Sequence, residues 1–338
     1  MILIDAVYIN SFGGKSLLEL FIEKIIDTKV KHHFLLDSRL ESKWVKKLKS
    51  DNYSIINASH KNRKTYYIDN ISRFSSILCL SNIPPPVKTK IKTSIYFHNR
   101  LLIQSMTNKI DLKSRLFILL KSVYIKRFNQ KDYSWIVQTP LMKKLLQDDL
   151  KIDSHNCHLY PFYKMKLTKS SFQKTLNSFV YISSNVPHKN HKRLIEAFID
   201  SAKKSNHELT LHITIDKNDQ LSSVLPNNLK IIYHKTLSIE KVNKLYGTCE
   251  FAIYPSLVES FGLPLIEAAN HGCKVIASDL PYVHEIIEPS LTFDPYSVES
   301  ISTSILKAIS EDLPKTKVLV ENKLDNFIDF IISQDVQR

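Results

Sequence analysis

The sequence has few cysteines, few glycines and no long apolar run. Its four cysteines, Cys79, Cys157, Cys249 and Cys273, are scattered and never spaced as Cys-x-x-Cys, which excludes a disulfide scaffold and a cysteine-based zinc site. No apolar run approaches the roughly 18 residues that are needed to cross a bilayer. The first residues reach Asp5 without a basic stretch, so we expect no signal peptide. These absences predict a reduced, cytoplasmic protein.

The chain nevertheless holds enough apolar side chains for a sizeable core. Of its 338 residues, 43% are hydrophobic and 24% are charged, which excludes wholesale disorder, and the length predicts two domains. Residues 1–170 carry 30 Lys+Arg against 13 Asp+Glu, a net charge of +17, whereas residues 171–338 carry 17 against 20, a net charge of −3. The basic half is expected to meet an anionic partner, such as a membrane face, a phosphorylated substrate or nucleic acid; the alternative is a solvated lysine-rich surface.

Short apolar runs alternate with amphipathic stretches in both halves. The first half opens with a strand-like run over 2–9 and a helix over 15–27, and the alternation restarts at 179–183. This pattern predicts an α/β protein with one doubly wound parallel sheet in each half. We therefore expect a first domain over 1–165, a polar linker over 166–178, a second domain over 179–318 and a C-terminal segment over 319–338 with an amphipathic helix.

The five glycines stand at places where a missing Cβ would matter. Gly13 and Gly14 come between the first strand and its helix, and Gly262 lies in a strand-to-helix loop. Gly272 follows a predicted helix, where it would serve as a left-handed cap, and Gly247 would end another helix. The first three are expected at the carboxyl ends of strands, where open α/β sheets bind ligands.

The segment 254–272 carries the most specific pattern. A predicted strand ends at Tyr254, a loop holds Glu259 and Gly262, and a helix opens near Pro264, with Glu267 expected in its first turn. Backbone N–H groups at the start of such a helix bind phosphate, and the two acids can bind sugar and ribose hydroxyls. The alternative is a capped helix with one acid in its first turn and one acid in an exposed loop.

Other motifs for binding phosphate, nicotinamide or metal are incomplete or absent. A P-loop ending at Gly14-Lys15-Ser16 would need glycine at position 9, which is Ile9. Neither Gly-x-Gly-x-x-Gly nor Asp-x-Asp occurs, so a nicotinamide fingerprint and a metal-chelating pair of aspartates are absent. His188 and His191 lack a carboxylate or cysteine companion, so we expect no metal site there.

Glu259 and Glu267, with Phe261-Gly262 between them, resemble the E-x7-E signature of glycosyltransferase family 4, whose members have the GT-B fold. The residues that follow Glu267 are similar to the sequence that follows the signature in family members, and several segments before Glu259 are also similar to the family. The resemblance is dense between about 179 and 295. The segments that carry it are Gly13-Gly14, Tyr96-Phe97-His98-Asn99, Val137-Gln138-Thr139, Lys189-Asn190-His191, 194–198, 267–268, Gly272, 275–279, Glu285 and Phe293-Asp294-Pro295.

The resemblance implies the GT-B fold of two facing Rossmann-like domains, the first binding the acceptor and the second the donor, with a C-terminal helix over 319–338 that packs back on the first domain. It also implies a retaining transfer of a sugar from a nucleotide diphosphate to an acceptor hydroxyl, with no metal and no cofactor. It implies that Lys189 binds the diphosphate, that Glu259 binds the donor sugar and that His98 lines the sugar pocket. Taken alone, His98 would instead be an ordinary histidine at a strand end. The expected donor-binding residues are Gly13, Gly14, Ser184, Arg193, Ser260, Phe261, Gly262, Leu263 and Glu267, of which Glu267 would hold the ribose.

One feature departs from the family. Members place an arginine about five residues before the phosphate-binding lysine, whereas the loop 183–188 has none here. The hydroxyl groups of Ser183 or Ser184 bring no charge. Either Arg193 or Lys192 replaces the missing cation, or the site has a single cation.

Residues 112–128 are apolar in their centre and carry Lys113, Arg115, Lys121, Lys126 and Arg127. Such a helix either lies on an anionic membrane or packs in the core with its lysines reaching out to water. The family resemblance favours a lipid-linked or phosphorylated glycan acceptor, lipopolysaccharide or capsule synthesis, and a location at the inner face of the cell membrane. The alternatives are a transferase with a soluble or protein acceptor, and a basic nucleic-acid-binding protein. We expect no nucleic-acid partner, because the two acids would repel phosphodiesters and no interleaved aromatic and basic motif occurs.

Overall fold

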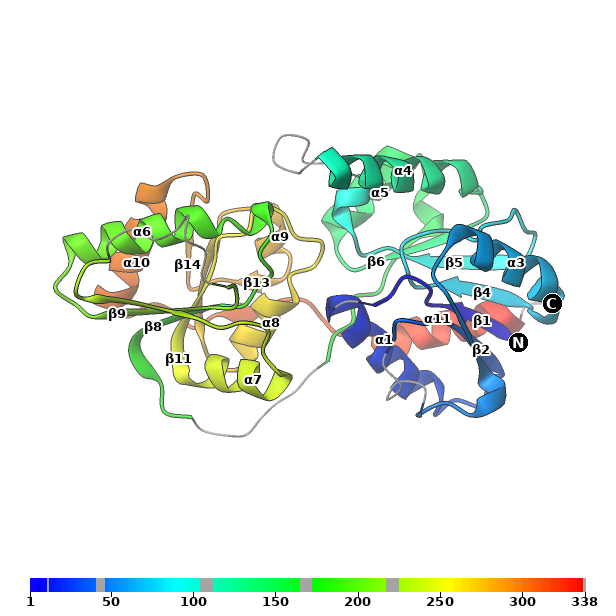
Figure 1. The fold of residues 1–338 in the computed structure, drawn as a ribbon, viewed down its shortest axis with the longest axis horizontal. Coiled ribbons are helices and arrows are strands. Elements are labelled where there is room, and N and C mark those ends of the chain that lie inside the picture. The colour runs from blue at the N-terminus through cyan, green and yellow to red at the C-terminus, as the bar shows by residue number, and fades with distance from the viewer. Residues whose placement is uncertain (11, 41–45, 104–111, 165–171, 217–224, 337–338) are drawn as a thin grey trace. The chain divides into compact units, whose positions relative to one another are not determined.

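The computed structural model describes the chain as two compact units (Figure 1). The described residues are 1–338 without 11, 41–45, 104–111, 165–171, 217–224 and 337–338. The first unit consists of Met1–Lys164 together with Glu321–Arg338, and the second consists of Met165–Val320. Each unit has its own parallel sheet, as the alternating pattern predicted.

Seven parallel strands form the sheet of the first unit, in the order β3-β2-β1-β4-β5-β6-β7. Their bounds are β1 Ile2–Asp5, β2 His32–Asp37, β3 Tyr53–Ile56, β4 Ser76–Cys79, β5 Lys92–Tyr96, β6 Ser134–Val137 and β7 Cys157–Leu159. Every residue of β1 is buried, as in a strand that is covered on both faces. The expected strand over 2–9 was too long. The chain turns after Asp5, whose carboxylate accepts the N–H of Val7 at 3.1 Å.

Helices cover both faces of this sheet. On one face, Phe21 of α1 and Phe327 of α11 lie with ring centroids 5.6 Å apart in a shared core. The core of the other face includes Tyr67, Ile125 and Leu146 from three further helices. The helix bounds are α1 Phe12–Ile25, α3 His60–Asn70, α4 Leu112–Phe128, α5 Pro140–Leu150 and α11 Leu324–Val336. Helix α11, which follows the second unit in the chain, therefore completes the core of the first unit.

Six parallel strands form the main sheet of the second unit, in the order β10-β9-β8-β11-β12-β14. Their bounds are β8 Thr175–Tyr181, β9 Leu209–Ile213, β10 Leu229–Tyr233, β11 Cys249–Tyr254, β12 Lys274–Ser278 and β14 Leu291–Phe293, and β13 Ile287–Glu288 pairs antiparallel with β15 Lys317–Val318. Of the expected linker, residues 166–171 lie outside the described residues, and residues 175–178 already belong to β8.

Two helices of the second unit pack together against one side of this sheet. Ser201 of α6 and Ser302 of α10 are buried, with their Oγ atoms 3.0 Å apart. Figure 1 draws α7 and α8 on the other side of the strands. The helix bounds are α6 His191–Lys204, α7 Ile239–Thr248, α8 Leu263–Asn270, α9 Pro281–His284 and α10 Val298–Ser310. The two Rossmann-like sheets and the returning helix α11 confirm the expected α/β fold class.

Two glycine positions illustrate how local sequence shapes the second unit. Gly272 has a φ of 73° just after α8, which is the left-handed cap that the sequence predicted. The expectation for Gly247 was wrong, because this residue lies inside α7 and does not end it. A Cβ there would stand 2.2 Å from Cδ2 of Phe172, so the glycine makes room for that ring.

Each sheet has one point where the strand order reverses. In the first unit β1 lies between β2 and β4, and in the second unit β8 lies between β9 and β11. The loops that leave two such neighbouring strands diverge, and open α/β sheets bind their ligands in the resulting gap at the carboxyl ends. The loops after β8 and β11 hold most of the residues that the sequence singled out.

Candidate active site

The loop after β8 fixes the backbone around Lys189. Residues 187–189 form a short 3₁₀ turn, and Asn190 adopts a left-handed conformation with a φ of 61° before α6 begins. The Tyr181 hydroxyl donates to the Lys189 carbonyl at 2.9 Å. The Asn190 amide donates to the carbonyls of Pro255 at 3.2 Å and Pro295 at 2.7 Å. Lys189 is therefore presented from a loop held by buried hydrogen bonds.

The loop after β11 is joined to the first loop. The Leu257 N–H donates to the His188 carbonyl at 2.8 Å. Ser256, which is fully buried, lies with its Oγ 2.9 Å from the Tyr181 hydroxyl, and its carbonyl accepts from the Tyr282 hydroxyl at 2.8 Å. Because Tyr181 donates its one proton to Lys189, Ser256 is the donor to Tyr181. These contacts make the two loops one preorganised platform.

Helix α8 starts as the sequence predicted, at Leu263 with proline at the second position. Gly262 precedes it with a φ of 89°, in the left-handed region, and a Cβ there would lie 3.1 Å from Cδ1 of Leu265. Glycine is thus required twice over, by its backbone angle and by the space. The first-turn N–H groups of a helix have no helical acceptors, so the start of α8 at Leu263 offers backbone donors four residues after Glu259.

Lys189 and Glu259 form a direct ion pair through Nζ and Oε1. Their side chains are 12% and 13% exposed, so the pair is largely screened from bulk water. The Lys189 ammonium also lies 5.9 Å from the centroid of the Tyr254 ring. The cation predicted for phosphate and the acid predicted for sugar are therefore in direct contact, and each balances the charge of the other.

Glu267 lies in the second turn of α8, not in the first turn as expected, because the helix opens at Leu263. The two residues are four apart and share one helix face, so the Glu267 side chain leans back toward the helix start. The residue is exposed to solvent, yet the protein packed around its carboxyl group raises the pKa of Glu267 to about 7 by desolvation. Its protonation state therefore changes near neutral pH.

The other donor-binding candidates of the second unit lie on the same two loops. Ser184 is exposed, Ser260 and Leu263 are partly exposed, and Phe261 is buried. Arg193 donates from Nη1 to Oδ1 of Asn190 at 2.9 Å. Of the two proposed substitutes for the missing arginine, Arg193 thus contacts the lysine loop, whereas Lys192 is exposed, 4.0 Å from Glu196.

The two histidines of this loop are uncharged at neutral pH. His191 lies with Nε2 2.9 Å from Oγ of Ser183, and burial lowers its pKa to about 4. Burial and then the charge of Lys189 lower the pKa of His188. Within the described ranges, no three His, Cys, Asp or Glu side chains gather as a metal site would require.

His98 follows β5 in the first unit and contacts Asn82. The Asn82 Oδ1 accepts the backbone N–H of His98 at 2.6 Å, which leaves its Nδ2 as the donor to the ring Nε2 at 3.2 Å. Because Nε2 accepts, the ring proton is on Nδ1. That buried atom has no hydrogen-bond partner among the residues that the structure describes. Burial lowers the pKa of His98 to about 4, so the ring is a neutral donor.

Gly13 and Gly14 do not form the loop that the sequence predicted. Both lie in the first turn of α1, which starts at Phe12 and not at Lys15. Neither has a positive φ, and a Cβ at Gly13 would meet nothing within 4 Å. A Cβ at Gly14 would lie 3.2 Å from Cγ2 of Ile9.

Sequence reasoning missed the residues that hold the loops in place. Tyr181, Ser256 and Tyr282 are buried tyrosine and serine residues within or after apolar runs, where they look like ordinary core positions. Asn82 was also missed. Its contact with His98 joins residues 16 apart in the chain, and no local sequence pattern indicates such a contact. Asn190 could have been noticed, since asparagine before a helix is a typical capping residue.

Part of the chain is similar to a family of known proteins. Residues 165–325, which contain Lys189, Glu259 and Glu267, match the family model described as "Glycosyl transferases group 1". The chain is 30% identical over 144 residues to the O-antigen chain mannosyltransferase RfbU of Salmonella typhimurium, covering 41% of this chain and 39% of that protein. It is 35% identical over 74 residues to the O-antigen chain mannosyltransferase B of Escherichia coli, covering 22% of this chain and 19% of that protein. The aligned parts thus span about two fifths and one fifth of these relatives.

Solved structures extend the similarity of fold to nearly the whole chain. The lipopolysaccharide outer core galactosyltransferase WaaB superposes with a TM-score of 0.66 at 13% identity, covering 99% of this chain and 95% of that one. WaaG, a glycosyltransferase involved in lipopolysaccharide biosynthesis, gives 0.65 at 14% identity, covering 92% and 91%. The protein therefore has the two-unit fold of these enzymes.

Proposed function

We propose that the protein is a retaining glycosyltransferase of the family 4 type, which moves a sugar from a nucleotide diphosphate to a hydroxyl group of a glycan. The observation that carries this proposal is the Lys189–Glu259 pair at the reversal point of the second sheet, on the loop that opens α8. A cation and a helix start supply what a departing diphosphate needs, which is compensation of its negative charge. The match of residues 165–325 supports the same activity.

In this proposal the residues of the second unit divide the donor between them. Lys189 and the N–H groups at 261–263 bind the diphosphate, with Arg193 as a second cation that Asn190 holds at the loop. Glu259 binds hydroxyl groups of the donor sugar, and Glu267 binds the ribose diol as a carboxylate. Ser184 and Ser260 line the part of the donor site that binds the diphosphate. No metal and no cofactor take part, and the nucleotide sugar is a substrate.

Retention of configuration would follow from attack on the face that the diphosphate leaves. The departing phosphate oxygen then accepts the proton of the acceptor hydroxyl, so no protein nucleophile is required. Glu259 suits a binding role, because its carboxylate is engaged in the ion pair with Lys189. From the first unit, the start of α1 at Gly13 and Gly14 offers further N–H groups. The neutral Nδ1–H of His98 is a donor for a sugar hydroxyl.

A nucleotide panel tests this proposal. We expect one of the GDP-, UDP- or dTDP-sugars to raise the melting temperature of the protein, beginning with GDP-mannose because the relatives RfbU and mannosyltransferase B are described as mannosyltransferases. Glu267→Ala should abolish the rise, whereas Glu196→Ala, at an exposed glutamate of α6, should keep it. Failure of every nucleotide sugar to stabilise the wild type, or a full rise in Glu267→Ala, would contradict the proposal.

We also propose that the acceptor is a lipid-linked or phosphorylated glycan of lipopolysaccharide or capsule synthesis, and that the protein binds peripherally to the inner face of the cell membrane. Among the described helices none is long and apolar enough to span a bilayer. Helix α4 carries instead a stripe of large apolar side chains at helical spacing, each more than half exposed: Leu116, Leu119, Leu120 and Val123. Exposed Arg115, Lys126 and Arg127 flank this stripe, which suits an anionic bilayer surface.

Leu120→Ser tests the membrane role of α4. Removing one leucine that is 60% exposed should weaken binding to vesicles with anionic phospholipid by about tenfold, because a leucine entering the bilayer contributes about 1–2 kcal/mol. Vesicle sedimentation measures the loss. Ile68→Ser on α3, at a side chain that is 61% exposed, is the matched control and should bind as the wild type does. Equal binding by all three proteins would count against the proposal.

A further inference from the structure

The reversal point of the first sheet, between β1 and β4, carries an unusual turn. Tyr8, three residues after β1, has a φ of 78°, which is rare for a bulky residue and is maintained only by its surroundings. The Tyr8 N–H donates to Oδ2 of Asp37, at the end of β2, at 3.0 Å. A reversal point of strand order is where open α/β sheets bind ligands. In the first sheet, the loop at this point thus carries a tyrosine in a strained backbone conformation.

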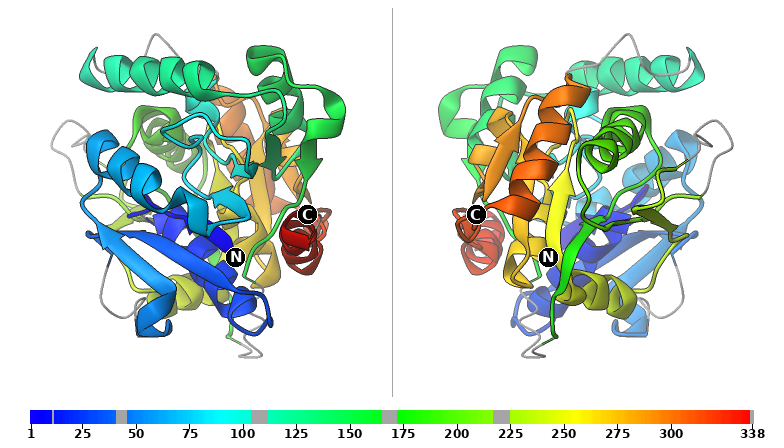
Figure 2. Two further views of the ribbon diagram at one scale, coloured as in Figure 1. Left: turned by 90° about the vertical axis from the view of Figure 1, so that its right-hand side faces the viewer. Right: turned by 90° about the vertical axis from the view of Figure 1, so that its left-hand side faces the viewer.

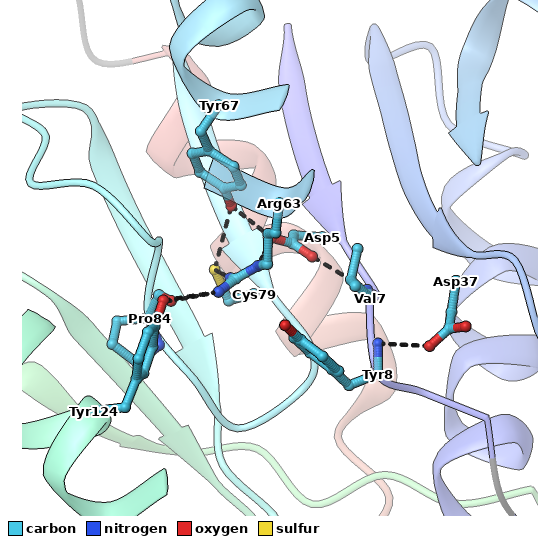
Figure 3. A network of polar contacts seen from close by, with 9 residues as sticks. All are labelled: Asp5, Val7, Tyr8, Asp37, Arg63, Tyr67, Cys79, Pro84 and Tyr124. Atoms are coloured by element: carbon cyan, nitrogen blue, oxygen red, sulfur yellow. Dashed lines mark hydrogen bonds and ion pairs between the residues drawn. The ribbon is translucent and has the colours of Figure 1, made fainter. Parts of the chain in front are cut away.

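A buried network fixes the strand end from which this turn leaves (Figure 3). The Asp5 carboxylate accepts from the Val7 N–H at 3.1 Å, from Nε of Arg63 at 2.7 Å and from the Tyr67 hydroxyl at 2.7 Å. Arg63 is 1% exposed and also donates to the Pro84 carbonyl at 2.8 Å. Figure 3 shows the Tyr8 ring directed away from Asp37. The charges of Asp5 and Arg63 therefore cancel beneath the turn.

Lys121 of α4 brings an uncompensated positive charge to this turn. Its ammonium lies 5.9 Å from the centroid of the Tyr8 ring and 4.5 Å from that of Phe117, and it is partly buried. No carboxylate of the described residues pairs with it. Asp37, which accepts the Tyr8 N–H, is bound by the Arg39 guanidinium at 2.9 and 2.6 Å.

The surroundings disfavour a lone ammonium at this place. Burial, together with the nearby charge of Arg39, lowers the pKa of Lys121. The Tyr8 hydroxyl likewise makes no hydrogen bond to any described residue. Among the described residues, a cation without a carboxylate partner and a hydroxyl without a hydrogen bond thus stand at the carboxyl edge of a sheet, beside the exposed apolar stripe of α4.

We propose that Lys121 and Tyr8 bind a phosphate group of the acceptor. This inference rests on the proposed function, since it gives the first unit a substrate. A lysine ammonium binds phosphate as a point charge with three donors, and the tyrosine hydroxyl adds one more. Phosphate esters reach such a site from two sources, a lipid carrier or a soluble sugar phosphate, and both present the same anionic oxygens.

The test uses the full chain with a saturating nucleoside diphosphate that occupies the donor site. Glycerol 3-phosphate serves as the soluble probe and farnesyl phosphate as the lipid probe, and calorimetry measures their affinity. Lys121→Gln should lower the affinity for whichever phosphate probe the wild type binds. We expect a loss of about tenfold or more, because one charged hydrogen bond is lost. Lys121→Arg should retain part of the affinity, and Tyr8→Phe should lose part of it. Lys204→Gln, at an exposed lysine on a helix of the second unit that pairs with Asp200 at 2.6 Å, is the matched control.

The possible outcomes distinguish a failure of the phosphate-site proposal from a failure of the donor-site proposal. Lys121→Gln should bind the nucleoside diphosphate as the wild type does, so a failure of the nucleotide panel and a failure at Lys121 are distinguishable. Binding of farnesyl phosphate alone identifies a lipid carrier, and binding of glycerol 3-phosphate identifies a soluble or sugar phosphate. Equal affinity of wild type and Lys121→Gln for both probes would overturn the proposal. So would binding of farnesol as tight as that of farnesyl phosphate, or no binding of either probe.

Discussion

Lys189→Gln should lower kcat of sugar transfer by about 100- to 1,000-fold, which is the usual cost of removing one group that stabilises charge in a transition state. The amide can still donate hydrogen bonds, but it brings no positive charge to the departing diphosphate. A radiolabelled donor and a glycan acceptor measure the loss. Lys192→Gln, three residues further along and fully solvated beside Glu196, is the matched control and should keep its activity.

The same substitution should also destabilise the fold, because it leaves the Glu259 carboxylate without its partner at a site that is 13% exposed. We expect a loss of about 1–3 kcal/mol in the free energy of unfolding. The double variant Lys189→Gln/Glu259→Gln carries two neutral amides and should recover most of that loss without recovering transfer. Denaturant unfolding and the transfer assay distinguish the two effects. Recovery of transfer in the double variant would mean that Lys189 serves only to neutralise Glu259.

Nucleotide binding should strengthen as the pH rises from 6 to 8, with a midpoint near the pKa of about 7 of Glu267. Only the carboxylate accepts hydrogen bonds from both hydroxyl groups of a ribose, and in the ligand-free protein this form is disfavoured by desolvation. Glu267→Gln should bind weakly at every pH and show no such dependence. Calorimetric titrations with a nucleoside diphosphate at several pH values measure it, and a wild type with pH-independent affinity would contradict this role.

Glu267 should have the opposite effect on stability. Its pKa is higher in the folded protein than in the unfolded chain, so between about pH 4.5 and pH 7 the folded state binds more protons. The contribution of this group to stability therefore falls as the pH rises through that range. Glu267→Gln should melt at a higher temperature than the wild type at pH 8, and at about the same temperature at pH 4. A site residue that opposes folding and favours ligand binding is the expected pattern for a functional carboxylate.

Most of the fold could be predicted from the sequence because both sheets are buried. Runs such as 33–36, 77–80 and 250–254 are mostly apolar, and each overlaps a parallel strand. The start of α8 could also be predicted, because the left-handed position before the helix favours glycine, here Gly262, and the first helical turn tolerates proline, here Pro264. The spacing between Glu259 and Glu267 likewise placed both acids at one loop and helix. The signals that succeeded were local ones.

The errors and omissions have physical causes of another kind. Gly13 and Gly14 were assigned to a loop because they precede the helix predicted over 15–27, yet α1 starts at Phe12 and includes both in its first turn. The pairing of Lys189 with Glu259 joins residues 70 apart, and the Asp5–Arg63 pair joins residues 58 apart. Such contacts depend on how strands are ordered in the sheet. A single sequence gives strand order only after the fold is known.

The course of the chain through its two units has a consequence for biosynthesis. The ribosome delivers residues 1–164 first, but the side chains of Phe327, Ile328 and Ile331 that close one face of their core emerge only after the entire second unit. Until then, apolar groups of α1 and of the first sheet remain open to water. The later-made unit is therefore the first that can reach its native state, and nascent chains that stop before α11 would expose a surface for chaperones and proteases to recognise.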